Sequence, residues 1–177
     1  MKKSFVFIII VPVFLMFSAI SLNAQEKEGI KKGKFEMTVV GSGTSDQDLD
    51  GTTLSAEAGL GYFVDDNLEL SIRQGSTYAD RPGDNEWNGS TRLAVDYHFN
   101  ANPLFPFIGG SFGYLYGDNV NEQFVAGPEA GLKLFASDHA FLFGLLEYEF
   151  LLDDPSDADD NFDNGRFVYS IGIGLTF

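Results

Sequence analysis

The chain has 177 residues, no cysteine and a formal net charge of −15 at pH 7. Its length suits one domain with a sizeable core. The lack of cysteine excludes disulfides, thiolate metal sites and a lipid-modified N-terminal cysteine, and the acidic balance argues against a nucleic-acid partner, because phosphates need a basic patch to neutralise them.

Residues 1–24 have the three parts of a secretory signal peptide. Lys2 and Lys3 form a positive start, an apolar run follows, and small and polar residues lead to Ala24. We expect export through the Sec pathway and cleavage after Ala24, which removes two lysines and lowers the net charge from −15 to −17. An uncleaved anchor is the alternative, but the apolar run is short for a spanning helix. Residues 25–33 then form a short polar leader, which we expect to be periplasmic.

Eight stretches that alternate between apolar and polar residues follow the leader, separated by turn signals. Alternation with a period of two is typical of strands, because successive side chains point to opposite faces. The pattern predicts strands at about residues 34–43, 52–64, 68–77, 89–99, 104–117, 122–135, 140–152 and 166–177. Pro128 lies inside the sixth stretch and cannot donate to a sheet ladder, so we expect a bulge there.

The last stretch, R-F-V-Y-S-I-G-I-G-L-T-F, has the clearest alternation, with one face entirely apolar and aromatic. Behind a secretory signal, this pattern predicts that the apolar face meets lipid. The connections after the second, fourth and sixth strands are tight, as periplasmic turns are, whereas those after the first, third and seventh are longer. The connection after the fifth strand is short and breaks this pattern. The sequence therefore predicts an all-β protein, an eight-stranded antiparallel up-and-down transmembrane β-barrel over residues 34–177, with a soluble secreted ligand-binding barrel as the weaker alternative.

Three segments resemble the small eight-stranded outer-membrane barrels of Gram-negative bacteria, the porin-like OmpA/OmpX-type group. They are P-F-I-G-G-S-F-G-Y at 106–114, G-P-E-A-G-L-K-L-F at 127–135 and Y-S-I-G-I-G-L-T-F at 169–177. The resemblance implies the outer membrane as location and outer-membrane lipid and lipopolysaccharide as surroundings. It also implies that Phe177 is the signal for the barrel-assembly machinery. Because members of this group differ in role, the resemblance implies location more firmly than activity.

The inward face of the predicted barrel is rich in charged side chains. It holds Glu36, Glu57, Glu69, Arg73, Arg92, Asp96, His98, Glu129, Lys133, Glu147, Glu149 and Arg166. An eight-stranded barrel is only just wide enough to be filled by its side chains, so buried charges there must pair or meet water. Arg73 and Arg92 fall near mid-height on neighbouring strands. We therefore expect a lumen charge network of Glu57, Arg73, Arg92, Glu129, Glu147 and Glu149. A polar plug is the favoured interpretation of this network and a gated narrow channel is the alternative.

Asp46, Asp48 and Asp50 are spaced like the ligands of a calcium-binding EF-hand loop, with Glu57 in the position of the last ligand. The context argues against such a site, because a strand rather than a helix follows. At about 3.3 Å per residue, an extended chain carries Glu57 roughly 15 Å away. The three aspartates are therefore weak candidates for a loose calcium contact, and we expect no metal site and no cofactor.

A second acidic stretch, residues 153–163, contains six aspartates. A solvated loop is the simpler interpretation, and a site for the divalent cations that bridge lipopolysaccharide is the alternative.

The only two histidines, His98 and His139, fall at the predicted periplasmic end, and no Ser-His-acid group converges. We therefore expect no enzymatic activity. The sequence predicts a monomeric outer-membrane barrel with a structural or surface-interaction role, with a narrow passive channel for small solutes or ions as the alternative.

Overall fold

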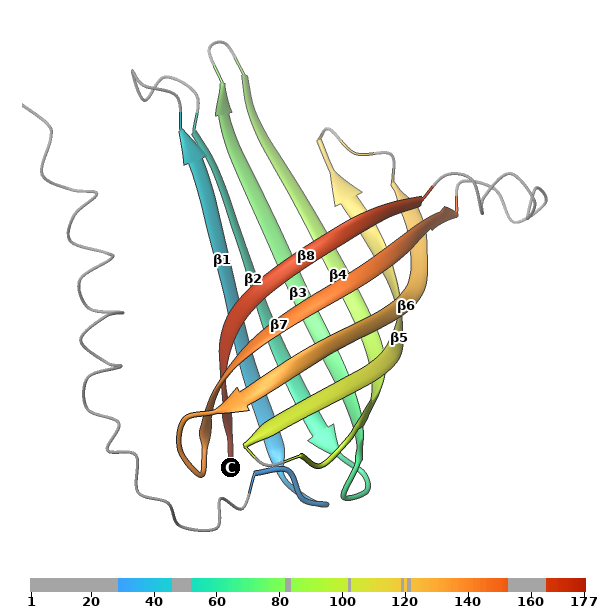
Figure 1. Cartoon of the computed structure of the whole chain (residues 1–177). Coiled ribbons are helices and arrows are strands. Elements are labelled where there is room, and N and C mark those ends of the chain that lie inside the picture. Colours follow the sequence, from blue (N-terminus) through green and yellow to red (C-terminus); the bar gives the residue numbers. More distant parts are fainter. Residues whose placement is uncertain are drawn as a thin grey trace, which may run out of the picture.

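The computed structural model describes residues 29–45, 52–81, 84–101, 103–118, 120, 122–152 and 165–177. In these residues eight antiparallel strands follow one another around a closed barrel (Figure 1). They are β1 (Phe35–Ser45), β2 (Thr52–Phe63), β3 (Leu68–Arg81), β4 (Asp84–His98), β5 (Leu104–Gly117), β6 (Gln123–Phe135), β7 (Ala140–Leu152) and β8 (Gly165–Thr176). The predicted eight-stranded antiparallel barrel is confirmed. The predicted signal peptide lies outside the described residues, within which no helix is long and apolar enough to cross a membrane.

The barrel has two distinct ends. The C-terminus and the turns after β2, β4 and β6 lie at one end, which we call the terminus end (Figure 1). The connections after β1, β3, β5 and β7 lie at the opposite end, which we call the loop end.

The β3–β4 hairpin is longer than the sequence predicts. Residues 78–88 were expected to form a polar connection, but most of them continue the two strands, with Tyr78 opposite Trp87 and Arg81 opposite Asp84. The Trp87 Nε1–H donates to the Ser76 hydroxyl at 2.9 Å. The expectation was wrong because a hairpin arm is stabilised by cross-strand pairs and does not need an apolar face on a core.

The expected bulge at Pro128 is also wrong. Pro128 lies opposite Gly110 of β5 in an unbroken register. The ladder with β7 keeps the same offset on both sides of the proline, from Ala126 opposite Phe150 to Glu129 opposite Glu147. The β6–β7 ladder has no pair at residues 127 and 128, which accommodates the missing N–H of the proline. No extra residue is inserted, so there is no bulge.

The two faces of the wall differ as predicted. Large apolar side chains from all eight strands point outward and are exposed, and they include Phe35, Leu54, Ile72, Leu93, Phe112, Phe124, Leu146 and Phe167. The inward face is polar and charged over most of its length, with Glu149 completely buried. This arrangement is the reverse of a soluble barrel, which packs apolar side chains inside.

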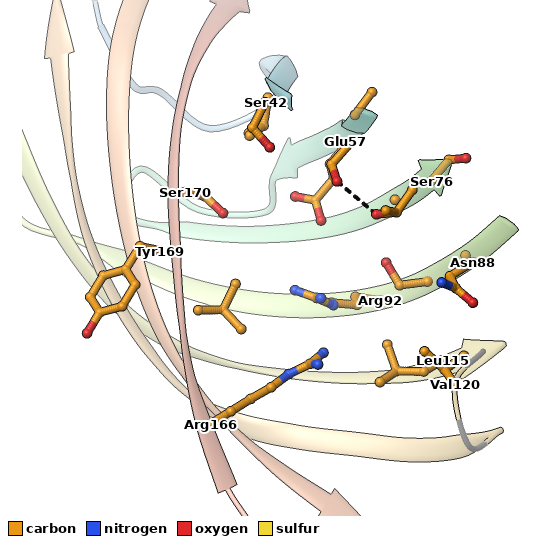
Figure 2. Close-up of a pocket in the computed structure, with 18 residues that line it drawn as sticks. Ser42, Glu57, Ser76, Asn88, Arg92, Leu115, Val120, Arg166, Tyr169 and Ser170 are labelled. Carbon is orange, nitrogen blue, oxygen red and sulfur yellow. Dashed lines mark hydrogen bonds between the residues drawn. The ribbon is translucent and has the colours of Figure 1, made fainter. Parts of the chain in front are cut away.

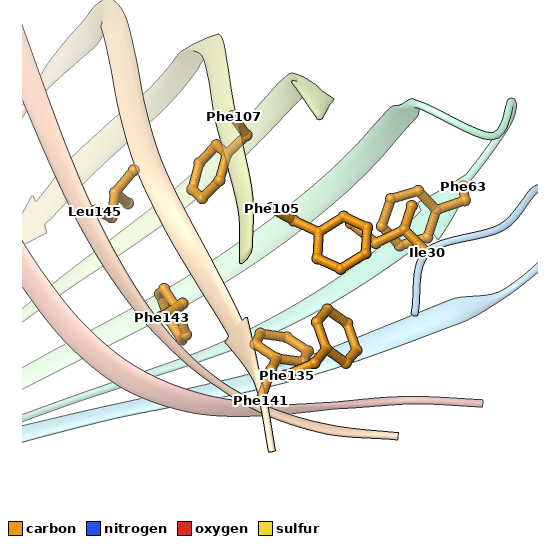
Figure 3. Close-up of a cluster of buried hydrophobic side chains, with 8 residues drawn as sticks. All are labelled: Ile30, Phe63, Phe105, Phe107, Phe135, Phe141, Phe143 and Leu145. Atoms are coloured by element: carbon orange, nitrogen blue, oxygen red, sulfur yellow. The ribbon is translucent and has the colours of Figure 1, made fainter. Parts of the chain in front are cut away.

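The terminus end is filled by one apolar cluster, drawn in Figure 3. Its members come from β2, β5, β6, β7 and the leader: Ile30, Phe63, Phe105, Phe107, Phe135, Phe141, Phe143 and Leu145. The rings form a continuous series, with Phe135 centred 5.2 Å from Phe105 and 5.0 Å from Phe141. The cluster occupies the inside of the barrel at this end.

The leader contributes a residue to the aromatic cluster, which the sequence did not predict. Ile30 is buried in the aromatic cluster. The chain reaches it through Gly29, whose φ is +47° and whose position leaves no room for a Cβ beside the Phe105 ring. The backbone N–H of Gly33 donates to the Phe63 carbonyl at 2.8 Å, which ties the leader to the end of β2.

Candidate functional site: the barrel lumen

Above the aromatic cluster, the first lumen layer is centred on Lys133. Its Nζ donates to both carboxylate oxygens of Glu36, at 2.7 and 2.8 Å, and to Glu69 at 2.8 Å. The Nε2 of His98 lies 3.5 Å from the same Glu69 oxygen. All four side chains are buried. One ammonium thus holds carboxylates from β1 and β3 together.

The ammonium of Lys133 also faces aromatic rings of the cluster below. Its Nζ lies 5.5, 5.4 and 5.3 Å from the ring centroids of Phe63, Phe107 and Phe141. These are cation–π distances, so the aromatic cluster and the first lumen layer stabilise one another.

The second lumen layer is centred on Arg73 of β3. Its guanidinium makes a two-pronged pair with Glu129 of β6, at 3.0 and 2.6 Å, and a 3.0 Å pair with Asp96 of β4. Two-pronged arginine–carboxylate pairs are strong because both hydrogen bonds are charge-assisted. Arg73 therefore ties two opposite walls of the barrel across its axis.

The third lumen layer is centred on Arg92. Its two terminal nitrogens lie 2.9 Å from Glu147 and 2.8 Å from Glu149, both on β7. The Ser111 hydroxyl donates to the other oxygen of Glu147. Arg166 of β8 adds a 2.7 Å bond from its Nε to Glu149.

Like charges are neighbours on each wall in these layers. Arg73 lies directly opposite Arg92 in the β3–β4 ladder, and Glu129 lies directly opposite Glu147 in the β6–β7 ladder. Like charges in such positions destabilise a sheet. Here each arginine instead pairs with a glutamate across the lumen, so the charges that conflict within each sheet stabilise the barrel as a whole.

Glycines provide the room for these side chains. A Cβ at Gly113 would lie 2.7 Å from Cγ of Arg92, and a Cβ at Gly61 would overlap the carboxylate of Glu69. A cavity of about 20 Å³ lies between the first two lumen layers, which is room for about one water molecule.

A larger cavity of about 310 Å³ lies on the loop-end side of Arg92 (Figure 2). Inward side chains of β1, β2, β3, β4, β5 and β8 line it, and many are short and hydroxylic, including Ser42, Ser55, Thr77, Ser90 and Ser170. The hydroxyls of Ser55 and Thr77 form a hydrogen bond of 3.0 Å.

Five members of the predicted charge network lie in the second and third lumen layers: Arg73, Arg92, Glu129, Glu147 and Glu149. The sixth, Glu57, lines the cavity and makes no ion pair or hydrogen bond with any described residue. The weak calcium candidates Asp46, Asp48 and Asp50 lie outside the described residues. No group of three or more His, Cys, Asp or Glu side chains arranged to hold a metal ion occurs among the residues that are described.

Phe177 lies at the terminus end, where it exchanges two backbone hydrogen bonds of 2.9 Å with Phe35. Its exposed ring is centred 6.1 Å from that of Phe35. His139 lies in the turn before β7, and its Nδ1 donates to the Thr176 carbonyl at 3.0 Å.

The predicted network omitted the Lys133 layer, although its members were placed on the inward face. Glu36 is one residue inside the start of β1 and Lys133 is two residues before the end of β6. β1 starts and β6 ends at the terminus end, so both residues lie within two positions of that end. Counting from the predicted strand ends would therefore have placed Glu36 and Lys133 at the same height in the lumen.

Three solved structures of outer-membrane barrels have this arrangement of strands. The N-terminal β-barrel domain of Pseudomonas aeruginosa OprF superposes with a TM-score of 0.61 at 20% identity, covering 82% of this chain and 98% of that one. OprG from Pseudomonas aeruginosa gives a TM-score of 0.57 at 12% identity, covering 86% and 99%. Neisserial surface protein A gives 0.51 at 11% identity, covering 81% and 94%.

The chain has the fold of the eight-stranded outer-membrane barrels. The resemblance inferred from the sequence is thus confirmed at the level of fold. No family model and no curated protein sequence matches the chain.

Proposed function

We propose that this protein is an integral outer-membrane barrel with a closed lumen and a structural or surface-interaction role. The observation that carries the proposal is the filling of the lumen. The cavity bounded by the aromatic cluster and the first two lumen layers has a volume of about 20 Å³, whereas a solute path needs a continuous opening. Buried charges that are all held by short ion pairs make a rigid plug.

The outward apolar face and the likeness to outer-membrane barrels support the membrane location. In this proposal the Sec pathway exports the chain, the barrel-assembly machinery inserts it with Phe177 as its signal, and the monomer lies among outer-membrane lipid and lipopolysaccharide. No enzymatic reaction is proposed. The imidazole of His98 is buried between the rings of Phe63 and Phe107, and that of His139 is bound to a backbone carbonyl.

Fractionation and solute uptake test the two parts of the proposal. The mature protein should be recovered from the outer-membrane fraction only with detergent. Reconstituted into liposomes, it should not accelerate the uptake of small sugars or amino acids. Recovery from the periplasm without detergent would contradict the location, and uptake that rises in proportion to inserted protein would contradict the closed lumen and favour the passive channel.

A further inference from the structure

The ladder that closes the barrel, between β1 and β8, is short. It runs from Glu36 opposite Thr176 to Val40 opposite Gly172, which is five pairs. The ladders of β1 with β2 and of β8 with β7 have eleven pairs each. Both strands continue toward the loop end while paired only to their other neighbour, and they diverge there (Figure 1). Residues 41–45 of β1 and 165–171 of β8 thus present two unpaired backbone edges, which we call the seam.

The seam lies within the apolar outer belt. The three most exposed large apolar side chains among the described residues are Ile171, Tyr169 and Phe167, at 79, 77 and 60%. They are this exposed because no strand flanks them on the β1 side. In a membrane, unpaired backbone N–H and C=O groups at this depth cost several kcal/mol each, so a ligand with polar groups next to the seam would offset part of this cost.

The 310 Å³ cavity lies directly behind the seam, and its lining includes the seam residues Ser42, Val168 and Ser170 (Figure 2). The cavity therefore borders the seam on one side and hydroxylic side chains of β2, β3 and β4 on the other. Its volume is at the lower limit of small-molecule sites. It can hold a lipid headgroup but not a whole lipid, whose acyl chain would have to leave through the seam.

Three charged side chains line the cavity (Figure 2). Arg92 of β4 is already held by Glu147 and Glu149, which leaves Arg166 of β8 and Glu57 of β2 to bind a ligand. Arg166 is half-exposed, and Glu149 binds only its Nε. No other described residue pairs with its terminal nitrogens, which are therefore available as donors for an anion. Glu57 makes no ion pair with a described residue, so its carboxylate remains an acceptor for a cation.

We propose that this cavity binds a single-chain phospholipid with a small zwitterionic headgroup, of the lysophosphatidylethanolamine type. Arg166 binds the phosphate, Glu57 binds the ammonium, the hydroxyls bind the glycerol, and the acyl chain passes between β1 and β8 into the bilayer. This inference rests on the proposed outer-membrane location and is independent of whether the lumen conducts. A fatty acid would satisfy Arg166 but would bring a second carboxylate toward Glu57.

Binding of lysophosphatidylethanolamine to the purified mature protein in nonionic detergent, followed by native mass spectrometry, tests the proposal. One lipid should be retained per barrel. Arg166→Gln and Glu57→Gln should each weaken retention by about tenfold or more, because each removes a charge-assisted contact. Glu57→Gln should also strengthen the retention of palmitate. Lys32→Gln, a charge change on the exposed leader, is the matched control and should change neither.

Four results would overturn the proposal: no saturable retention, equal retention by all variants, palmitate retained as well as the zwitterionic lipid by the unmodified protein, or a dimer whose formation excludes lipid. Migration of unheated samples on a gel verifies that each variant is folded. A protein that requires detergent but retains no lipid would refute this inference alone, whereas a protein soluble without detergent would refute the proposed location.

Discussion

The terminus end and the loop end of this barrel differ in how the interior supports the wall. Toward the terminus end, inward positions carry Phe, Lys, Arg and Glu, which meet across the axis and tie opposite strands together. Toward the loop end, inward positions of β1 and β8 carry Ser42, Val168 and Ser170, which are too short to span the lumen, and Arg166, which pairs with Glu149 of the neighbouring β7. The wall is closed where long side chains cross the lumen, and β1 and β8 separate where they do not.

The largest difference between the two ends is expected at Lys133. Lys133→Met leaves the carboxylates of Glu36 and Glu69 buried without their cation, so we expect a loss of about 3–5 kcal/mol in the free energy of unfolding. The fraction of protein that migrates as the folded band on gels of unheated samples, measured over a range of urea concentrations, gives this loss. Lys32→Met, on the exposed leader, should change the same quantity by less than about 1 kcal/mol. Equal effects would show that the Lys133 layer does not stabilise the barrel.

The aromatic cluster gives a second large effect. Phe135 is fully buried at the terminus end, so Phe135→Ala should cost about 3–5 kcal/mol through lost apolar contact and the cavity left behind. Phe124→Ala, at an exposed outward position of the same strand, is the matched control and should cost clearly less. Unfolding midpoints in urea compare the two, and the reverse order would place the stabilising contacts outside the barrel.

Two glycine-to-alanine substitutions compare the crowded interior with the open exterior, because each adds a single methyl group. A Cβ at Gly61 would overlap Glu69, whereas a Cβ at Gly144 meets nothing within 4 Å. We expect Gly61→Ala to destabilise the protein by about 1–3 kcal/mol and Gly144→Ala to leave stability unchanged or slightly raised. Thermal unfolding followed by circular dichroism compares the two variants, and a loss of stability in Gly144→Ala alone would contradict the assignment of the faces.

The smallest effect is expected at the loop end. Arg166 is half-exposed and has one carboxylate partner among the described residues, so Arg166→Met should cost at most about 1 kcal/mol. Arg73→Met, which removes a buried guanidinium from Glu129 and Asp96, should cost about 3–5 kcal/mol. If both variants unfold at the same urea concentration, the two ends do not differ in the way that the side-chain contacts indicate.

Alternation with a period of two was sufficient to predict the eight strands and both faces, apart from the arm of the β3–β4 hairpin, because it records which side of the wall each residue occupies. It placed Arg73 and Glu129 on the inward face, but their pairing spans 56 positions and depends on the register of every strand between them. Ile30 was missed because one apolar residue in a polar leader has no periodicity. The seam was missed because β1 and β8 alternate along their whole length, whether or not they pair.

Planar-bilayer recording tests the closed lumen most directly, because ions pass through openings too small for other solutes. Insertion of the mature protein should give no steady conductance above that of the protein-free bilayer, and Arg73→Ala or Arg92→Ala should open transient conductance by removing a cross-lumen tie. A steady conductance in the unmodified protein that changes in either arginine variant would contradict the account, because it would place an ion path through the layers that we describe as closed.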